Sequence, residues 1–182
     1  GLLFNEENVL LDPYSRAVTG QRKWGEKPEG GKDFEYRARV VKSSFDWGNI
    51  KQLEQPFEDL VIYETHVRGY TKDKSSGVSA PGTFAGLKDK IPYLKDLGIN
   101  AVELMPIFEF DEMESARVVD GVQLYNYWGY NTVSFFAPNT SYAFNEEHNH
   151  EGDELKSLIK ALKENGIEVI LDVVFNLSLI HI

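Results

Sequence analysis

The amino-acid sequence predicts an α/β fold with a parallel sheet, and two observations carry this prediction. Residues 94–99 and 162–167 share the pattern of a helix end, a turn at glycine and the start of an apolar strand, and the second copy lies 68 residues after the first. Residues 168–175, after the second copy, are almost wholly apolar, as is typical of a parallel strand covered on both faces. The repeated unit indicates right-handed crossovers, and it fits a barrel and a doubly wound sheet equally well.

The first 47 residues are predicted to be rich in β-structure. An apolar run at 9–11 ends at Asp12-Pro13, a turn-forming pair. Residues 34–41 alternate aromatic or apolar with polar side chains, the pattern of a half-buried strand. Glycine, proline and charged residues at 25–32 predict a loop between them.

The first strand–helix–strand cycle begins with a short apolar strand at 60–64. Apolar residues at helical spacing predict a helix over 83–97. Pro92 lies inside this pattern, so we expect a break near 90–91. A buried strand is predicted at 101–105.

In the second cycle, Asp153 is expected to cap a helix that Gly166 ends, followed by the strand at 168–175. Residues 106–150 are too many for an ordinary connection, and connections of that length usually have a function of their own.

Composition narrows the classes of ligand. The 182 residues carry a formal net charge of −10, which disfavours nucleic acid and anionic membranes as partners. The chain has no cysteine, and no apolar stretch approaches the ~20 residues of a membrane span. The histidines do not form a metal-ligand set and no phosphate-binding glycine loop is present, so no metal and no cofactor are expected.

The long connection is unusually aromatic. Tyrosine and tryptophan faces suit the C–H-rich faces of sugar rings, while their polar groups bond hydroxyls. The alternative is that these side chains fill a small core under the loop, and we expect Phe135 and Phe136 to be core and Tyr130 to be exposed. The aromatic side chains are Tyr125, Tyr127, Trp128, Tyr130, Phe135, Phe136, Tyr142 and Phe144.

Two acidic residues interrupt predicted strands. Asp172 stands where an aliphatic residue would fit better, and a buried carboxylate is costly unless it is paired. It is either a site residue or a structural carboxylate, and Glu103 has the same two interpretations. By contrast, Asp111, Glu112 and Glu114 are expected to form a solvated charged bend.

Several segments together resemble the α-amylase superfamily (glycoside hydrolase family 13), in its isoamylase and glycogen-debranching branch. Val61–Thr71 resembles the first barrel strand, Tyr127–Asn131 the aromatic motif after the second strand, and Asp172–Asn176 the first conserved region. The remaining similar segments are Leu10–Tyr14, Gly82–Leu87 and Val102–Pro106.

For the fold, the resemblance implies a partial TIM (β/α)8 barrel with about the first three strands, preceded by the end of a β-sandwich domain. The implied division is a C-terminal part of a glucan-binding-like β-sandwich at 1–47, the first part of the catalytic barrel at 48–176, and a non-native tail at 177–182. The chain is thus expected to be an N-terminal fragment.

For function, the resemblance implies a retaining glycosidase that hydrolyses α-1,6 branch linkages in glycogen- or starch-type glucans with two carboxyl groups ~5–5.5 Å apart. Tyr130 would be the platform under the sugar, Asp172 would support that subsite, and Trp128 and Asn131 would shape the loop; these four are the expected substrate-binding residues. An α-glucan is the implied partner. The implied compartment is the cytoplasm, or the plastid in a plant or alga.

The sequence also departs from the family pattern in two ways that bear on catalysis. The family's first conserved region ends in Asn-His, whereas Leu177 stands at the histidine position. The strands with the nucleophile and the acid/base come later in the family, so no catalytic residue is assigned and the chain alone is expected to be inactive. There are two alternatives. The chain is a noncatalytic glucan-binding or regulatory truncation, or it is a fragment of a branching or transglycosylating enzyme.

Overall fold

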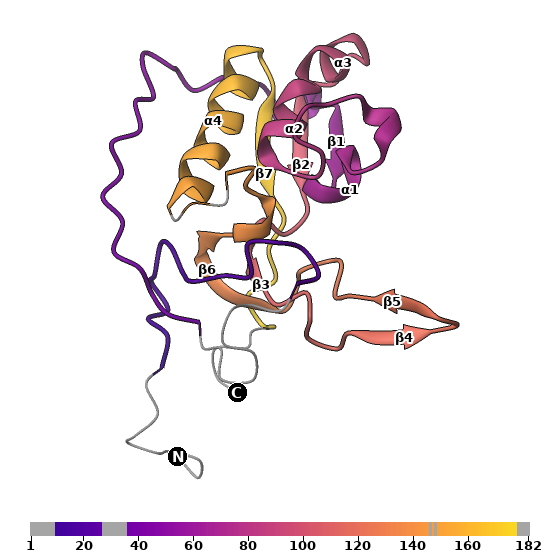
Figure 1. Cartoon of the computed structure of the whole chain (residues 1–182). Helices are drawn as coiled ribbons and strands as arrows, with labels where there is room; N and C mark the ends of the chain where they lie inside the picture. Colours follow the sequence, from indigo (N-terminus) through magenta and orange to yellow (C-terminus); the bar gives the residue numbers. More distant parts are fainter. Residues whose placement is uncertain (1–9, 27–35, 146, 148, 178–182) are drawn as a thin grey trace.

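The computed structural model describes residues 10–26, 36–145, 147 and 149–177. At its centre is a parallel sheet of three strands in the order β1-β2-β7 (Figure 1). The strands are β1 (Ile62–Thr65), β2 (Ala101–Leu104) and β7 (Glu168–Leu171). All three strands expected from the sequence are present, and helical crossovers lead into β2 and into β7.

The third strand is shorter than the predicted 168–175. Its ladder ends where the Asp172 N–H donates to the Leu104 carbonyl at 2.9 Å. Strand β2 stops there because Pro106, two residues on, has no N–H to continue a ladder. The apolar run predicted the strand but not its end, because the end depends on the neighbouring strand.

The predicted 83–97 helix is broken, as Pro92 led us to expect. It forms α2 (Phe84–Asp89) and α3 (Ile91–Asp96), and Lys90 joins them. The Thr83 hydroxyl caps α2 by accepting from the Gly86 N–H at 3.1 Å.

Two further helices complete the set. Helix α1 (Val67–Thr71) was not predicted, and its single turn is too short to give a periodic signal. Helix α4 (His150–Glu164) begins before the expected cap Asp153, which lies in the first turn and pairs with Lys156 at 3.2 Å. The residue at the cap position is Asn149, with a φ of 70°.

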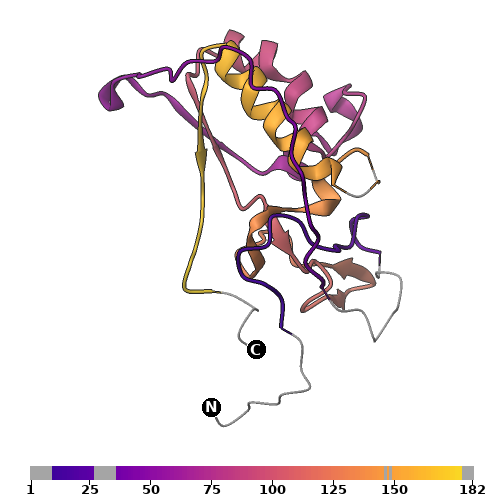
Figure 2. The ribbon, with the colours of Figure 1, turned by 90° about the vertical axis from the view of Figure 1, so that its left-hand side faces the viewer.

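The helices pack on one side of the sheet, and its other face is not covered by them (Figure 2). Side chains alternate between the two faces of a strand, so one set from each strand joins the helices in a single apolar core. The fully buried part of this core includes Phe84, Leu87, Leu94, Val102, Leu104, Leu158 and Leu162.

Residues 106–150 hold more structure than the sequence predicted. Strand β3 (Phe108–Phe110) pairs antiparallel with β6 (Thr132–Pro138). The hairpin of β4 (Arg117–Val119) and β5 (Val122–Leu124) projects from the body of the molecule (Figure 1). Short 3-10 turns lie at η2 (Phe57–Asp59), η3 (Lys74–Ser76) and η4 (Thr140–Tyr142).

The expected core role of Phe136 is wrong. Its side chain is 54% exposed and stacks on Tyr14, with ring centroids 5.8 Å apart. Phe135 is only half-buried and packs against Phe175 at 5.3 Å. No further layer of the described chain packs over these two side chains, so neither becomes fully buried.

The N-terminal segment contains less regular structure than predicted. The turn at Asp12-Pro13 is confirmed, since the Ser15 N–H donates to the Asp12 carbonyl at 3.0 Å. The strand predicted at 34–41 is not formed over 36–41, where a single bridge joins Val18 and Ala38. Residues 1–9 and 27–35, which include parts of the predicted strands and loop, lie outside the described residues.

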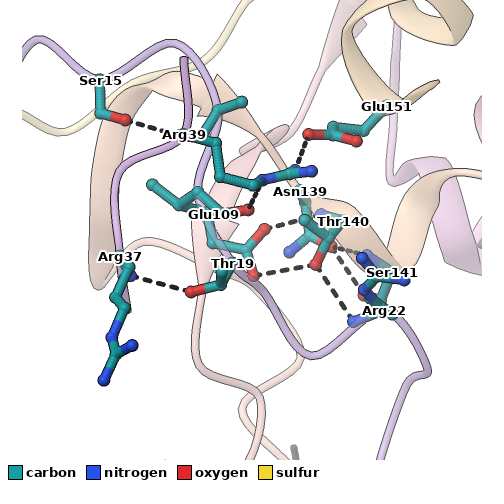
Figure 3. Close-up of polar contacts among 12 residues, drawn as sticks. Ser15, Thr19, Arg22, Arg37, Arg39, Glu109, Asn139, Thr140, Ser141 and Glu151 are labelled. Atoms are coloured by element: carbon teal, nitrogen blue, oxygen red, sulfur yellow. Dashed lines mark hydrogen bonds and ion pairs between the residues drawn. The ribbon is translucent and has the colours of Figure 1, made fainter. Parts of the chain in front are cut away.

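Instead of forming a sheet, this segment is held by side chains that belong to the rest of the chain (Figure 3). Arg39 forms a buried ion pair with Glu151 at the start of α4. The Arg22 N–H donates at 3.1 Å to the Thr140 hydroxyl, which in turn donates to Glu109 at 3.2 Å. Polar bonds between distant residues therefore replace the predicted ladder.

The segment from 42 to 56 then runs beside α4 (Figure 1). Three lysines spaced along α4 donate hydrogen bonds to this segment. The bonds run from Lys156 to the Ser43 hydroxyl, from Lys160 to the Asp46 carbonyl and from Lys163 to the Gln52 amide oxygen, at 2.5, 3.1 and 3.3 Å.

Candidate active-site face

The uncovered face of the parallel sheet carries carboxylates. Glu64 of β1 is the register partner of Glu103 of β2, and Glu103 is the partner of Ile170 of β7. Asp172 follows Ile170 by two residues, so alternation places it on the same face. The neighbouring positions Val102 and Leu104 point the other way, into the core under the helices. Glu64, Glu103 and Asp172 thus share one side of the sheet.

Tyr130 from the long connection binds to this group of carboxylates. Its hydroxyl donates to Asp172 Oδ2 at 2.5 Å. That hydrogen bond, partial burial and the charges of Asp172, Glu64 and Glu103 raise the pKa of Tyr130 to about 12. Tyr130 therefore stays a neutral phenol that donates its proton to Asp172. It is half-buried rather than exposed as expected, because this bond draws it toward the sheet.

A glycine next to Tyr130 lets the loop pack closely. Gly129 has a φ of +79°, and a Cβ added there would lie 2.5 Å from the ring of Phe110. Only glycine fits both the left-handed backbone and the ring.

His66 anchors the other end of the loop. Its Nδ1 accepts from the Gly69 N–H at 3.1 Å, so its Nε2 carries the hydrogen, which faces the Tyr127 carbonyl at 2.8 Å. The imidazole also stacks on the Tyr127 ring at 4.1 Å. Burial lowers the pKa of His66, so the neutral ring is favoured. The histidine fixes the position of the loop and belongs to no metal set among the described residues.

The two other expected substrate-binding residues lie apart from Tyr130 and Asp172. Trp128 and Asn131 line an open cavity of about 620 Å³, whose walls include neither Tyr130 nor Asp172. The Asn131 amide donates to Glu114 at 2.6 Å, and Trp128 is 54% exposed. The structure therefore places the four expected residues in two neighbouring groups.

The acidic bend was misjudged from the sequence. Glu112, expected in solvent, is fully buried, with Oε1 accepting from the Gly25 N–H at 3.2 Å. Its Oε2 has no hydrogen-bond partner within the described part of the chain. Burial, aided by the charge of Asp111, raises the pKa of Glu112 to about 7. Asp111 and Glu114, also expected in solvent, are half-buried. No local sequence signal distinguishes Glu112 from them, because Gly25 is far away in the chain.

Glu109 is a second buried carboxyl that the sequence did not single out. It accepts from the Thr140 N–H at 2.6 Å and the Thr140 hydroxyl at 3.2 Å (Figure 3). Burial raises the pKa of Glu109 to about 8. In a regular strand, Glu109 would point to the face opposite that of Phe108 and Phe110. The pairing of β3 with β6 shifts register on both sides of Glu109, so this simple alternation does not hold in β3.

Comparison with known proteins adds to this geometry. Residues 40–179 match the family described as "Alpha amylase, catalytic domain". The chain belongs to this α-amylase family. The three-stranded sheet, with helices on one face, is accordingly part of a TIM-barrel-type catalytic domain, which decides between the two folds that the repeat left open.

Curated proteins with similar sequences are named as isoamylases and as homologues of the glycogen operon protein GlgX. Isoamylase 1 of Arabidopsis thaliana is 41% identical over 97% of this chain, and isoamylase 3 of Oryza sativa is 44% identical over 97%. A glycogen operon protein GlgX homologue of Haemophilus influenzae is 36% identical over 98%. The chain spans about a quarter of these proteins, 24%, 23% and 28% in turn.

Solved structures of pullulanases are similar in fold to this chain. A GBS pullulanase in complex with maltotetraose has a TM-score of 0.70 and 30% identity, covering 92% of this chain and 23% of its own. A Bacillus subtilis type I pullulanase complexed with maltose has a TM-score of 0.69 and 27% identity, covering 91% of this chain and 23% of its own.

A search of the described residues for membrane-spanning helices found none of sufficient length and apolar character.

Proposed function

We propose that this chain is part of a retaining α-glucan debranching glycosidase that hydrolyses α-1,6 branch linkages in glycogen- or starch-type glucans. The observation that carries the proposal is the Tyr130–Asp172 pair over the carboxylate-bearing face of the β1-β2-β7 sheet. Similarity to isoamylases, GlgX homologues and pullulanases supports it. The maltotetraose and maltose in the pullulanase structures support an α-1,4-linked glucan segment as the ligand.

In this proposal each site residue has a distinct task. The ring of Tyr130 supports the sugar at the cleavage position, and Asp172 fixes the orientation of that ring through its hydroxyl. Trp128 and Asn131 contact the glucan beside it. The chain contributes none of the catalytic carboxyl groups, so we infer that it binds glucan without cleaving it.

The proposal includes a division of the chain and a compartment. Residues 1–47 would be the end of a β-sandwich domain, residues 48–176 the first part of the barrel, and residues 177–182 a non-native tail, of which 178–182 lie outside the described residues. The compartment would be the plastid, as for the chloroplastic isoamylases, or the cytoplasm.

Calorimetric titration of the chain with maltotetraose tests the site. We expect Tyr130→Ala to weaken binding about tenfold, because the aromatic platform is lost. Tyr130→Phe, which keeps the ring and loses only the bond to Asp172, should bind within about threefold of the wild type. Equal affinity of Tyr130→Ala and the wild type, or no binding by either, would count against the proposed site.

A further inference from the structure

A group of lysines lies on one surface of this acidic chain. Lys160 and Lys163 of α4 and Lys51 of the neighbouring segment line a cavity of about 480 Å³, which we call the lysine pocket. Its volume lies within the range of ~300–1,000 Å³ that is common for small-molecule sites. Among the described lining residues Glu164 alone is acidic, so the lining is positively charged, whereas the whole chain carries a net charge of −10. The pocket therefore favours an anionic ligand.

Two of the ammonium groups are held in place. Lys160 donates to the Asp46 carbonyl at 3.1 Å, and Lys163 donates to the Gln52 amide oxygen at 3.3 Å. A Cβ added at Gly48 would lie 3.4 Å from Lys160 Nζ, so the backbone passes close to this ammonium. An ammonium group has three N–H donors, so each lysine keeps donors for a ligand. Cations fixed in this way lose little conformational entropy when an anion binds.

The segment 47–53 adds uncharged donors to the pocket. The backbone N–H groups of residues 49–53 and the Asn49 side chain form no hydrogen bond with another described residue. Asp46 and Glu54 flank the segment in the chain but do not line the pocket, and the Asp46 carboxylate already accepts from the Gly48 N–H at 2.8 Å. Ammonium groups together with N–H donors match the oxygens of a phosphoryl group.

Trp47 gives the pocket an aromatic wall. Its indole is 40% exposed and meets Phe45 edge to face, with ring centroids 5.0 Å apart. An exposed indole face suits the C–H-rich face of a sugar ring, and the side-chain amides of Asn49 and Gln52 can bond its hydroxyls. Fixed cations beside one flat aromatic face thus match a sugar that carries a phosphoryl group.

The proposed glucan contacts do not account for this pocket. Its described lining includes none of the four residues Tyr130, Asp172, Trp128 and Asn131. Helix α4, which forms one wall, packs on the covered side of the sheet (Figure 2). A ligand in the lysine pocket therefore touches different residues from a glucan at Tyr130.

We propose that the lysine pocket binds a phosphorylated sugar, with Lys51, Lys160 and Lys163 around the phosphoryl group and the sugar ring on Trp47. The inference goes beyond the proposed function and does not depend on it. It gives the lysines of α4 a second task besides holding the segment 42–56.

The experiment titrates the 182-residue chain with glucose 6-phosphate in a calorimeter. Inorganic phosphate, glucose and AMP are titrated in parallel to separate the contributions of the phosphoryl group and the ring. We expect glucose 6-phosphate to bind more tightly than phosphate, glucose or AMP, and added salt to weaken its binding. We also expect it to change the tryptophan fluorescence, and Trp47→Phe, which retains Trp24 and Trp128, should lose that change.

Charge-removing variants test the lysines. We expect Lys163→Gln and Lys51→Gln each to weaken glucose 6-phosphate binding about fivefold, because each removes one cation from the pocket. Lys88→Gln is the matched control. It removes the same charge and the bond from Lys88 to the Ser157 hydroxyl at 3.0 Å, but Lys88 does not line the pocket, so its affinity should stay within about twofold of the wild type.

Thermal melts show whether the variants are folded. Lys51 is exposed and forms no hydrogen bond with another described residue, so Lys51→Gln keeps the test valid if Lys163→Gln loses stability. Maltotetraose affinity should be the same in all three lysine variants, which separates this pocket from the proposed function.

Four results would overturn the lysine pocket and leave the proposed function in place. They are no binding of glucose 6-phosphate by the wild type, equal weakening in Lys88→Gln and the pocket variants, phosphate binding as tight as glucose 6-phosphate, and tighter binding of AMP. Loss of affinity confined to the pocket variants, with the fluorescence change absent in Trp47→Phe, would support it.

Discussion

At the scale of single residues, the carboxyl of Glu112 couples the stability of the chain to pH. It is fully buried, and burial raises its pKa from 4.5 to about 7. As the pH rises from 4.5 to 7, the unfolded chain loses this proton while the folded chain retains it. The unfolded state then binds fewer protons than the folded state, so the free energy of unfolding falls as the pH rises through that window. Above pH 7 this group lowers the free energy of unfolding no further.

Replacing Glu112 by glutamine removes this titration. We expect the free energy of unfolding of Glu112→Gln, measured relative to the wild type, to rise by about 2–3 kcal/mol between pH 4.5 and pH 8, since one pKa unit corresponds to ~1.4 kcal/mol. Urea unfolding at a series of pH values measures the difference, which includes a contribution from Glu109 because the charge of Glu112 raises the pKa of that carboxyl. A difference that stays constant with pH would contradict a raised pKa at Glu112.

At the scale of elements, the loop before β6 is positioned by close packing on β3 as well as by hydrogen bonds. His66 holds it at Tyr127, and Gly129 lets it lie against the ring of Phe110. The loop in turn places Tyr130 against Asp172 and Trp128 in the cavity. The proposed site thus depends on how tightly the loop can approach β3.

Two glycines with the same backbone allow this packing to be tested. Gly129 and Gly121 both have a φ of +79°, but a Cβ at Gly121 would meet nothing within 4 Å, whereas a Cβ at Gly129 would clash with Phe110. We expect Gly121→Ala to lower the free energy of unfolding by ~1 kcal/mol at most, from backbone strain. Gly129→Ala should cost ~1–3 kcal/mol more, from overpacking.

Chemical unfolding of the two variants measures these costs. Because the backbone strain is matched, the difference between them isolates the contact with Phe110. Equal losses of stability in the two variants would show that the loop can shift to accept a methyl group.

At the scale of the whole molecule, one face of the parallel sheet is packed under helices (Figure 2). The other face presents Glu64, Glu103 and Asp172. The covered face stabilises the sheet by burying apolar area. The uncovered face carries the proposed glucan contacts. Folding and binding thus use opposite sides of the same three strands.

On this basis we expect the 182-residue chain to bind maltotetraose but to release no reducing sugar from glycogen or pullulan above a blank. The reason is that no residue of the chain is assigned as nucleophile or acid/base, and hydrolysis with retention needs both. A reducing-sugar assay measures this directly. Release that disappears in Glu103→Gln or Asp172→Asn would contradict the expectation and place catalysis on this face.

Some features were determined by the sequence alone, because their causes act over a few residues. The apolar runs specify the three parallel strands, and Pro92 specifies the helix break at Lys90. The motif at 172–176, together with the other family segments, also identified the α-amylase family, which the match to its catalytic domain confirms.

Other features were decided only by the tertiary structure, because they depend on partners far away in the chain. Strand β7 ends where β2 ends, and Glu112 is buried because Gly25 lies against it. The separation of Trp128 from Tyr130 likewise follows from the approach of Trp24 and the β4–β5 hairpin to one side of the loop. A sequence pattern records which side chains are apolar or charged, whereas burial depends on which distant segments cover them.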